Sequence, residues 1–274
     1  MAAVLFGMTG ILGALIHANA WVVTLGRAAF AVLAIGGFAA LMRQSLLRGV
    51  DRSAARVLGT SGALLAVHWV TFFIAVKVGG VAVATLGFAS FPAFIALIDA
   101  GYYRERIGRG EAARLLMVTA GLVLVTPSFN LADQGTTGLL WGLASGLSFG
   151  CLAVVNRRGA GHLSPVQVAF WQNVVVALLV APITLWAGQA PQASDWVYMA
   201  LLGVLCTGLA QYLFVRALGG MNARSVGMII ALEPVYAIAV AWPLFGEQPS
   251  LRMLCGAVLI VLAALLPSRR KQAG

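Results

Sequence analysis

The sequence predicts an all-α membrane protein in which ten transmembrane helices form two inverted five-helix repeats. Three observations lead to this class: the composition, the spacing of the apolar runs, and an internal repeat. Of the 274 residues, 61% are hydrophobic and only 9% are charged, and the mean hydropathy is +0.95. Soluble domains carry about 25% charged residues. We therefore expect this chain to lie in a lipid bilayer.

Apolar runs separated by polar or charged residues give ten candidate helices, most of them near the roughly 20 residues that cross a bilayer. The 32 glycines suit a dense bundle, because small residues let transmembrane helices approach each other closely. The expected spans cover residues 2–17, 21–42, 56–76, 81–101, 111–127, 136–155, 165–187, 196–217, 222–245 and 250–267.

The basic residues indicate how these spans are oriented. The formal net charge is +10, and 15 of the 18 Lys and Arg residues fall in alternate loops or in the C-terminal tail. Because Lys and Arg gather in cytoplasmic loops, we expect a multi-pass protein of the inner (cytoplasmic) membrane with both termini in the cytoplasm. The charge is then a topology signal, so the expected partner is the lipid bilayer and not nucleic acid. Lys77 and Arg252 fall on the outer side, and Arg27 falls within a span.

The repeat covers most of the chain. Residues 56–80 align without gaps to residues 196–220, and in each half a proline precedes a glutamate by thirteen residues: Pro92 and Glu105, then Pro234 and Glu247. We divide the chain into a first repeat, 1–128, and a second repeat, 136–268, which together form one membrane unit. Five helices is an odd number, so the second repeat enters the membrane upside down. A binding site is expected near the two-fold axis.

The two prolines of the repeat lie near the middle of their spans, where proline removes a backbone hydrogen bond and kinks a helix. Such a kink is either a static fit to the bundle or a hinge beside a cavity, and we predict hinges at Pro92 and Pro234. A helix of thirteen residues rises roughly 20 Å. Glu105 and Glu247 are therefore expected just outside the membrane.

Two charged residues fall inside spans. Glu233 lies eleven residues into its span, where an ionised acid costs roughly 2.5 to 3.5 kcal/mol. It is either a proton-coupling acid or a neutral carboxyl that hydrogen-bonds a neighbouring helix. Its counterpart in the first repeat is Phe91, so the acid is not part of a symmetric relay. Arg27 lies six residues into its span and either holds a carboxylate or locks helix packing through backbone carbonyls; its rough counterpart is Gln172.

Polar and aromatic residues also occur at matching levels of the third and eighth spans. Under the offset of 140, Phe72 corresponds to Tyr212, and His68 lies one helical turn before Phe72. A lone histidine in a span either packs or lines a cavity, and Trp171 at a helix start is alternatively an interfacial anchor. The residues that we expect at the substrate site are His68, Trp69, Phe72, Trp171, Gln172, Gln211, Tyr212, Arg27 and Glu233.

Enzyme and metal signatures are absent from the sequence. It contains no HExxH motif, no Walker loop and no cluster of cysteine and histidine. The three cysteines, Cys151, Cys206 and Cys255, all fall in apolar stretches, where we interpret them as packing residues. We therefore expect no catalytic residues, no metal and no cofactor, and we do not expect an enzyme.

Several segments together resemble one family. They are FGMTG at Phe6 to Gly10, Arg27 in TLGRAAF, FPAF with the later Glu105, and LEPVYAIAVAWPLFGE at Leu232 to Glu247. In their order and repetition they resemble the drug/metabolite transporter superfamily, in its EamA-type branch. The resemblance implies ten helices with cytoplasmic ends and a central cavity bordered mainly by the third, fourth, eighth and ninth helices. Bacterial members of this size resemble exporters of amino acids and related metabolites, including the YddG-type exporters of aromatic amino acids.

These observations favour a secondary transporter that exports amino acids, aromatic or otherwise amphipathic, and related small metabolites by alternating access. The alternative is an antiporter for phosphorylated metabolites or nucleotide-sugars. That class needs several cationic groups in its cavity, whereas only Arg27 lies inside a span, with Lys77 and Arg216 at helix ends. A membrane scaffold is a third possibility, which a solid bundle without a cavity would favour. The sequence is compatible with a monomer and leaves the oligomeric state open.

Overall fold

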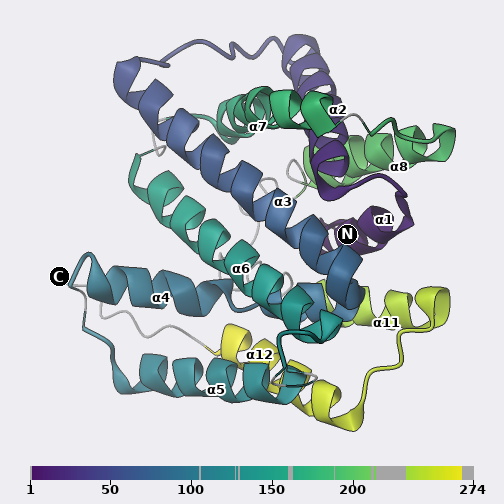
Figure 1. Cartoon of the computed structure of the whole chain (residues 1–274). Coiled ribbons are helices and arrows are strands. Elements are labelled where there is room, and N and C mark those ends of the chain that lie inside the picture. The colour runs from purple at the N-terminus through teal and green to yellow at the C-terminus, as the bar shows by residue number, and fades with distance from the viewer. Residues whose placement is uncertain are drawn as a thin grey trace.

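The computed structural model describes residues 2–104, 106–126, 128, 130–159, 163–187, 189–210, 213 and 233–266, and its regular structure in these ranges is entirely helical. The predicted fold class, an all-α membrane protein, is confirmed (Figure 1). The elements are α1 (Ala2–Leu15), α2 (Ala20–Leu41), α3 (Arg52–Phe88), α4 (Phe91–Gly101), α5 (Arg109–Val125), α6 (Gln134–Gly159), α7 (Pro165–Ala187), α8 (Ala193–Gly203), η1 (Val204–Leu209), α11 (Glu233–Phe245) and α12 (Leu251–Leu265).

The boundary between the third and fourth predicted spans lies at Gly80 in the structure. We expected separate helices at 56–76 and 81–101, and α3 consists of two helical segments that meet at a kink at Gly80, the second of which ends at Phe88. Gly80 has φ 82° and ψ 169°, a conformation that favours glycine because it has no Cβ. The carboxylate of Glu247 then accepts hydrogen bonds from the amides of Val81 (2.8 Å) and Ala82 (3.0 Å). A side chain from the other half of the chain therefore caps the segment that follows the kink.

The fourth predicted span is itself interrupted at Ala89 and Ser90, where α3 ends and α4 begins. Pro92 occupies the first turn of α4. Proline has no amide hydrogen and its ring clashes with the carbonyl four residues earlier, so a straight, continuous helix is disfavoured at this position. The Ser90 hydroxyl donates to the Gly87 carbonyl (2.7 Å) at the break. We expected a kink at Pro92 within one span, and the structure instead separates α3 from α4 just before this proline. The action of Pro92 as a hinge stays a prediction.

Helices α3 and α6 lie side by side through the centre of the bundle (Figure 1). Glycine allows this close approach: a methyl group on Gly79 would lie 2.8 Å from Gly138 Cα, and one on Gly87 would lie 3.0 Å from Gly142 Cα. Around this pair, α2 packs on α7, α5 on α12, α1 on α11 and α4 on α6. Small residues thus replace large apolar side chains where helices meet in the bilayer.

Large apolar side chains cover much of the outer surface. Leu33, Leu116, Leu178, Leu185 and Trp186 are between 69% and 90% exposed. Among the described residues, α2, α3, α6 and α7 are long and apolar enough to cross a membrane, and the remaining apolar helices are shorter. In a bilayer these exposed side chains contact lipid, as expected for a multi-pass membrane protein.

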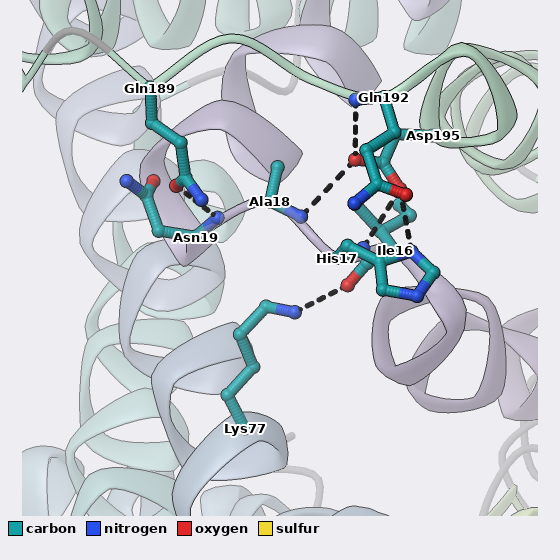
Figure 2. A network of polar contacts seen from close by, with 8 residues as sticks. All are labelled: Ile16, His17, Ala18, Asn19, Lys77, Gln189, Gln192 and Asp195. Atoms are coloured by element: carbon teal, nitrogen blue, oxygen red, sulfur yellow. Dashed lines mark hydrogen bonds and ion pairs between the residues drawn. The ribbon is translucent and has the colours of Figure 1, made fainter.

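Charged side chains hold the turn between α1 and α2 (Figure 2). The Asp195 carboxylate accepts hydrogen bonds from the amides of His17 (2.8 Å) and Ala18 (3.2 Å), and also from the Gln192 amide (3.0 Å). From the opposite side, Lys77 Nζ donates to the Ile16 carbonyl (2.6 Å). An acid from the second half and a base from the first half thus fix a turn that has little regular structure of its own. We refer to these contacts as the turn network.

Candidate functional site

A cavity of about 380 Å³ lies at the centre of the bundle. A volume of this size falls in the range of small-molecule sites. Its walls come from α1, α2, α3, α4, α6, α7, η1 and α11. The lining residues are Phe6, Thr9, Arg27, Leu65, His68, Trp69, Phe72, Phe88, Phe91, Phe149, Leu152, Ala153, Asn156, Gln172, Asn173, Cys206, Thr207 and Glu233.

Six of the nine residues expected at the substrate site line this cavity: Arg27, His68, Trp69, Phe72, Gln172 and Glu233. Trp171 lies elsewhere, because its indole Nε1 donates to the Leu46 carbonyl (2.8 Å) and so joins α7 to the loop that follows α2. Gln211 and Tyr212 lie outside the described residues. Of the two expected hinges, Pro92 lies in the first turn of α4, and Pro234 is buried in the described part of α11, directly after Glu233.

Arg27 is held by two contacts in the cavity wall. Its guanidinium carbon lies 4.0 Å from the centroid of the Trp69 ring, and its Nε donates to Thr207 Oγ1 (2.9 Å). Only 5% of the residue is exposed. Neither contact uses the two terminal nitrogens, which make no hydrogen bond within the described part of the chain. The arginine is therefore fixed in direction while its outer edge stays available.

The partner of Arg27 lies on η1, a π-helical segment. The Thr207 hydroxyl donates to the Leu202 carbonyl five residues earlier (3.0 Å), which matches the wider π-helical turn. Such single wide turns occur often at functional sites because they redirect side chains. Just before it, Gly203 meets α2 so closely that a methyl group would lie 2.6 Å from the Arg27 carbonyl oxygen. The wide turn brings Cys206 and Thr207 to the cavity.

An aromatic wall forms the α3 and α6 side of the cavity. The ring centroid of His68 lies 5.0 Å from those of Phe88 and Phe149, and Phe88 and Phe91 stack at 5.2 Å. His68 is oriented by Ser145: the Ser145 hydroxyl donates to the His68 carbonyl, so Nδ1, which lies 2.7 Å from Ser145 Oγ, is assigned the hydrogen. These rings offer flat apolar surfaces to a ligand.

The polar residues of α7 differ in how well they are paired. Gln172 Nε2 donates to Ser61 Oγ (2.8 Å) and to Asn156 Oδ1 (2.9 Å), so its amide group joins α7 to α3 and α6. Asn173 Nδ2 donates to the Ala169 carbonyl (2.8 Å), but its buried Oδ1 accepts no hydrogen bond from the described residues. A buried unpaired acceptor is costly. Gln172 is thus a structural contact at the cavity wall, whereas the Asn173 acceptor has no partner in the part of the chain that the structure describes.

Glu233 and Arg27 line the same cavity from α11 and α2. Their oxygen and nitrogen atoms do not approach within 4.0 Å, so they form no ion pair. No hydrogen bond joins the Glu233 side chain to another described residue. The cavity therefore presents one basic and one acidic side chain that are not joined by an ion pair.

Sequence reasoning missed several lining residues. Phe88 and Phe149 look like ordinary apolar residues of a span, and Asn156 fell beyond the predicted end of the sixth span at 155, whereas α6 continues to Gly159. Thr207 gave only the weak signal of a hydroxyl in an apolar run. Among the described residues, no group of three His, Cys, Asp or Glu side chains could hold a metal ion.

Comparisons with known proteins add the family context. Residues 136–269 match the model of the EamA-like transporter family. The chain is 25% identical to the pseudopaline exporter CntI of Pseudomonas aeruginosa over 85% of this chain and 81% of that protein. It is 22% identical to an S-adenosylmethionine uptake transporter of Rickettsia bellii over 74% and 69% of the two chains.

A solved crystal structure shares the fold. It superposes with a TM-score of 0.69 at 22% identity, and the alignment covers 96% of this chain and 92% of the other. At this identity the similarity supports the fold alone. The expected resemblance to YddG-type exporters stays a prediction.

Proposed function

We propose that the chain, whose residues 136–269 match the EamA-like transporter family, is a secondary transporter that exports amino acids and related small metabolites. The observation that carries the proposal is the central cavity, whose wall combines aromatic rings with Arg27 and Glu233. Rings of this kind suit an aromatic or otherwise amphipathic ligand. A cavity inside the bundle also argues against a membrane scaffold.

The cavity argues against the alternative antiporter of phosphorylated metabolites. Arg27 is the one cationic side chain among its described lining residues. A phosphate carries nearly two negative charges at neutral pH, and phosphate sites use clusters of Arg or Lys. A neighbouring anionic group, Glu233, would oppose such a ligand further. The composition of the wall therefore favours a ligand without a phosphate group.

Alternating access between two inverted repeats is the second part of the proposal. In the two repeats, α4 corresponds to α11 and α6 corresponds to α1, so the contact of α4 with α6 is equivalent to the contact of α11 with α1. The contacts of α2 with α7 and of α5 with α12 each join two corresponding helices. This pairing supports a two-fold axis through the cavity. With both termini in the cytoplasm, the turn network lies on the outer side, and the breaks at Gly80 and Pro92 lie on the moving elements.

Flux measurements in proteoliposomes test the proposal. The purified full chain is reconstituted, and the exchange of radiolabelled amino acids is followed in both directions, with and without a proton gradient. We expect saturable flux of at least one aromatic or amphipathic amino acid. Both directions are needed, since similar proteins include an exporter and an uptake transporter. Absence of flux for every amino acid would contradict the proposal, and flux of phosphorylated compounds alone would favour the alternative.

The role of Glu233 in coupling is tested in the same assay. If Glu233 carries the coupled proton, the Glu233→Gln variant transports without dependence on the proton gradient. A variant that keeps the gradient dependence of the wild-type protein would show that Glu233 is not the coupling acid.

A further inference from the structure

We propose that the cavity recognises a zwitterion in one orientation, with the carboxylate on Arg27, the ammonium group on Glu233, and the flat apolar part against the rings of His68, Phe88 and Phe149. This inference rests on the proposed function and extends it, because it assigns each part of the ligand to a side chain. It also specifies the charge that the ligand must carry, which is a positive and a negative group with no net charge.

The state of Arg27 is the first argument. Trp69 stacks on its guanidinium at 4.0 Å and Thr207 accepts from its Nε at 2.9 Å, so the side chain is already ordered before a ligand arrives. Its terminal nitrogens make no hydrogen bond within the described residues. A guanidinium edge whose N–H groups have no acceptor among the described residues matches the two oxygens of a carboxylate. A pre-ordered arginine binds such a group without the entropy cost of fixing a long side chain.

The second argument concerns the charge balance of the cavity. Arg27 and Glu233 face the same space, yet they do not approach within 4.0 Å of each other. Charged groups inside a membrane protein normally pair, because an unpaired charge is costly there. A ligand that carries both charges supplies a partner to each side chain at once. A net anion or a net cation would satisfy one side chain and be repelled by the other.

The aromatic wall supplies the third argument. His68, Phe88 and Phe149 come from α3 and α6 and lie 5.0 to 5.4 Å apart between ring centroids. Arg27 and Glu233 come from α2 and α11. The charged groups and the rings are therefore contributed by different helices, so the cavity has a polar part and an apolar part. An amphipathic zwitterion has the same division.

Three ligands that share one phenyl ring and a short alkyl chain test the inference. L-Phenylalanine carries both charges, phenethylamine lacks the carboxylate, and 3-phenylpropionate lacks the ammonium group. Their affinities are measured by calorimetry on the full chain in lipid nanodiscs. We expect phenylalanine to bind about 10- to 100-fold more tightly than either analogue, since each lost hydrogen-bonded charge has roughly this effect. Equal binding of phenylalanine and phenylpropionate would show that Glu233 does not read the ammonium group and would overturn the inference.

Variants then assign each charge to its side chain through a double-mutant cycle between protein and ligand. In Arg27→Gln, the preference for phenylalanine over phenethylamine should disappear while the preference over phenylpropionate remains. In Glu233→Gln, the preference for phenylalanine over phenylpropionate should disappear, while the preference over phenethylamine remains. Arg56→Gln removes an exposed arginine at the start of α3 and should leave all three affinities unchanged. An equal loss for all three ligands in the two cavity variants would indicate a structural role and overturn the inference.

Two further outcomes separate this inference from the proposed function. Flux of phenylalanine in proteoliposomes together with equal binding of the three ligands would overturn the inference and leave the proposed function in place. If no amino acid binds or is transported, both fail. Should Arg27→Gln not fold, Arg27→Lys keeps the positive charge and loses the paired N–H edge, and it should reduce the preference over phenethylamine only in part.

Discussion

The turn network and the central cavity each contain a buried charged residue, Asp195 and Arg27, and they differ in how their charged groups are paired. In the turn network, the buried Asp195 carboxylate accepts three backbone hydrogen bonds, and Lys77 donates to a carbonyl. In the cavity, Arg27 makes one side-chain hydrogen bond through Nε, and Glu233 makes none with the described residues. Buried polar groups in folded proteins are normally satisfied. The turn network therefore serves the fold, and the unpaired cavity charges are available to a ligand.

The pKa of Asp195 is consistent with this difference. Asp195 lies in the first turn of α8, before the apolar run that begins at Trp196. Burial raises the pKa of its carboxyl, but hydrogen bonds from His17, Gln192 and Ala18 outweigh that effect, so the pKa lies below its ordinary value. The ionised form is thus the one that the folded turn stabilises.

The largest expected effect is on transport, from a change in the cavity. Arg27→Gln removes the free guanidinium edge, and we expect transport of a carboxylate-bearing substrate to fall about 10- to 100-fold. The measurement is initial flux in proteoliposomes at equal protein content. The melting temperature should change less than in the Asp195 variant below. If Arg27→Gln instead lost much of its stability while the flux per folded molecule stayed unchanged, Arg27 would serve the fold and not the ligand.

The second effect is on stability, from a change in the turn network. Asp195→Ala leaves the buried amides of the turn without their acceptor, and we expect a loss of about 2 to 3 kcal/mol. The melting temperature in detergent should fall by about 5 to 10 °C. The relative affinities of the three phenylalanine-like ligands should stay the same. A shift in ligand preference would mean that the turn network takes part in recognition.

A smaller effect is expected at the kink in α3. Glu247→Ala removes the carboxylate that caps the amides of Val81 and Ala82, which should cost about 1 kcal/mol. Glu247→Gln keeps one acceptor oxygen and should cost less. Melting temperatures of both variants check this order. Equal stability of the alanine variant and the wild-type protein would show that the segment after Gly80 needs no cap.

The smallest effect is a pH dependence of stability. Because the folded-state pKa of Asp195 is lowered, its stabilising contribution is complete above pH of about 4, the ordinary aspartate pKa, and is lost as the pH falls through the lower folded value. The difference in melting temperature between the wild-type protein and Asp195→Asn should therefore become smaller as the pH is lowered from 6 to 3. These pH values lie about two units above and one unit below the ordinary aspartate pKa. A difference that grows toward acid pH would contradict the assignment.

The sequence alone determined the class of the fold and the residues that are chemically unusual in it. Composition and span length indicated a helical membrane protein. Arg27 and Glu233 stood out because a charge inside a span is costly, and His68, Trp69 and Phe72 stood out as a polar and aromatic group. The proline rule predicted a kink at Pro92, close to the break between α3 and α4. Each of these signals is local, so it can be read without knowledge of the neighbouring helices.

Only the tertiary structure decided which of these residues meet. A membrane helix is apolar on all sides, so its sequence does not show which face turns inward. For this reason Phe149 and Thr207 could not be recognised as cavity residues, and Trp171 could not be recognised as a contact to the Leu46 carbonyl. The same limit applies to Asp195 and Glu247, whose partners lie about 165 to 180 residues away in the chain. Contacts at such separations depend on how whole helices pack, and that packing decides which charges are paired and which remain open to a ligand.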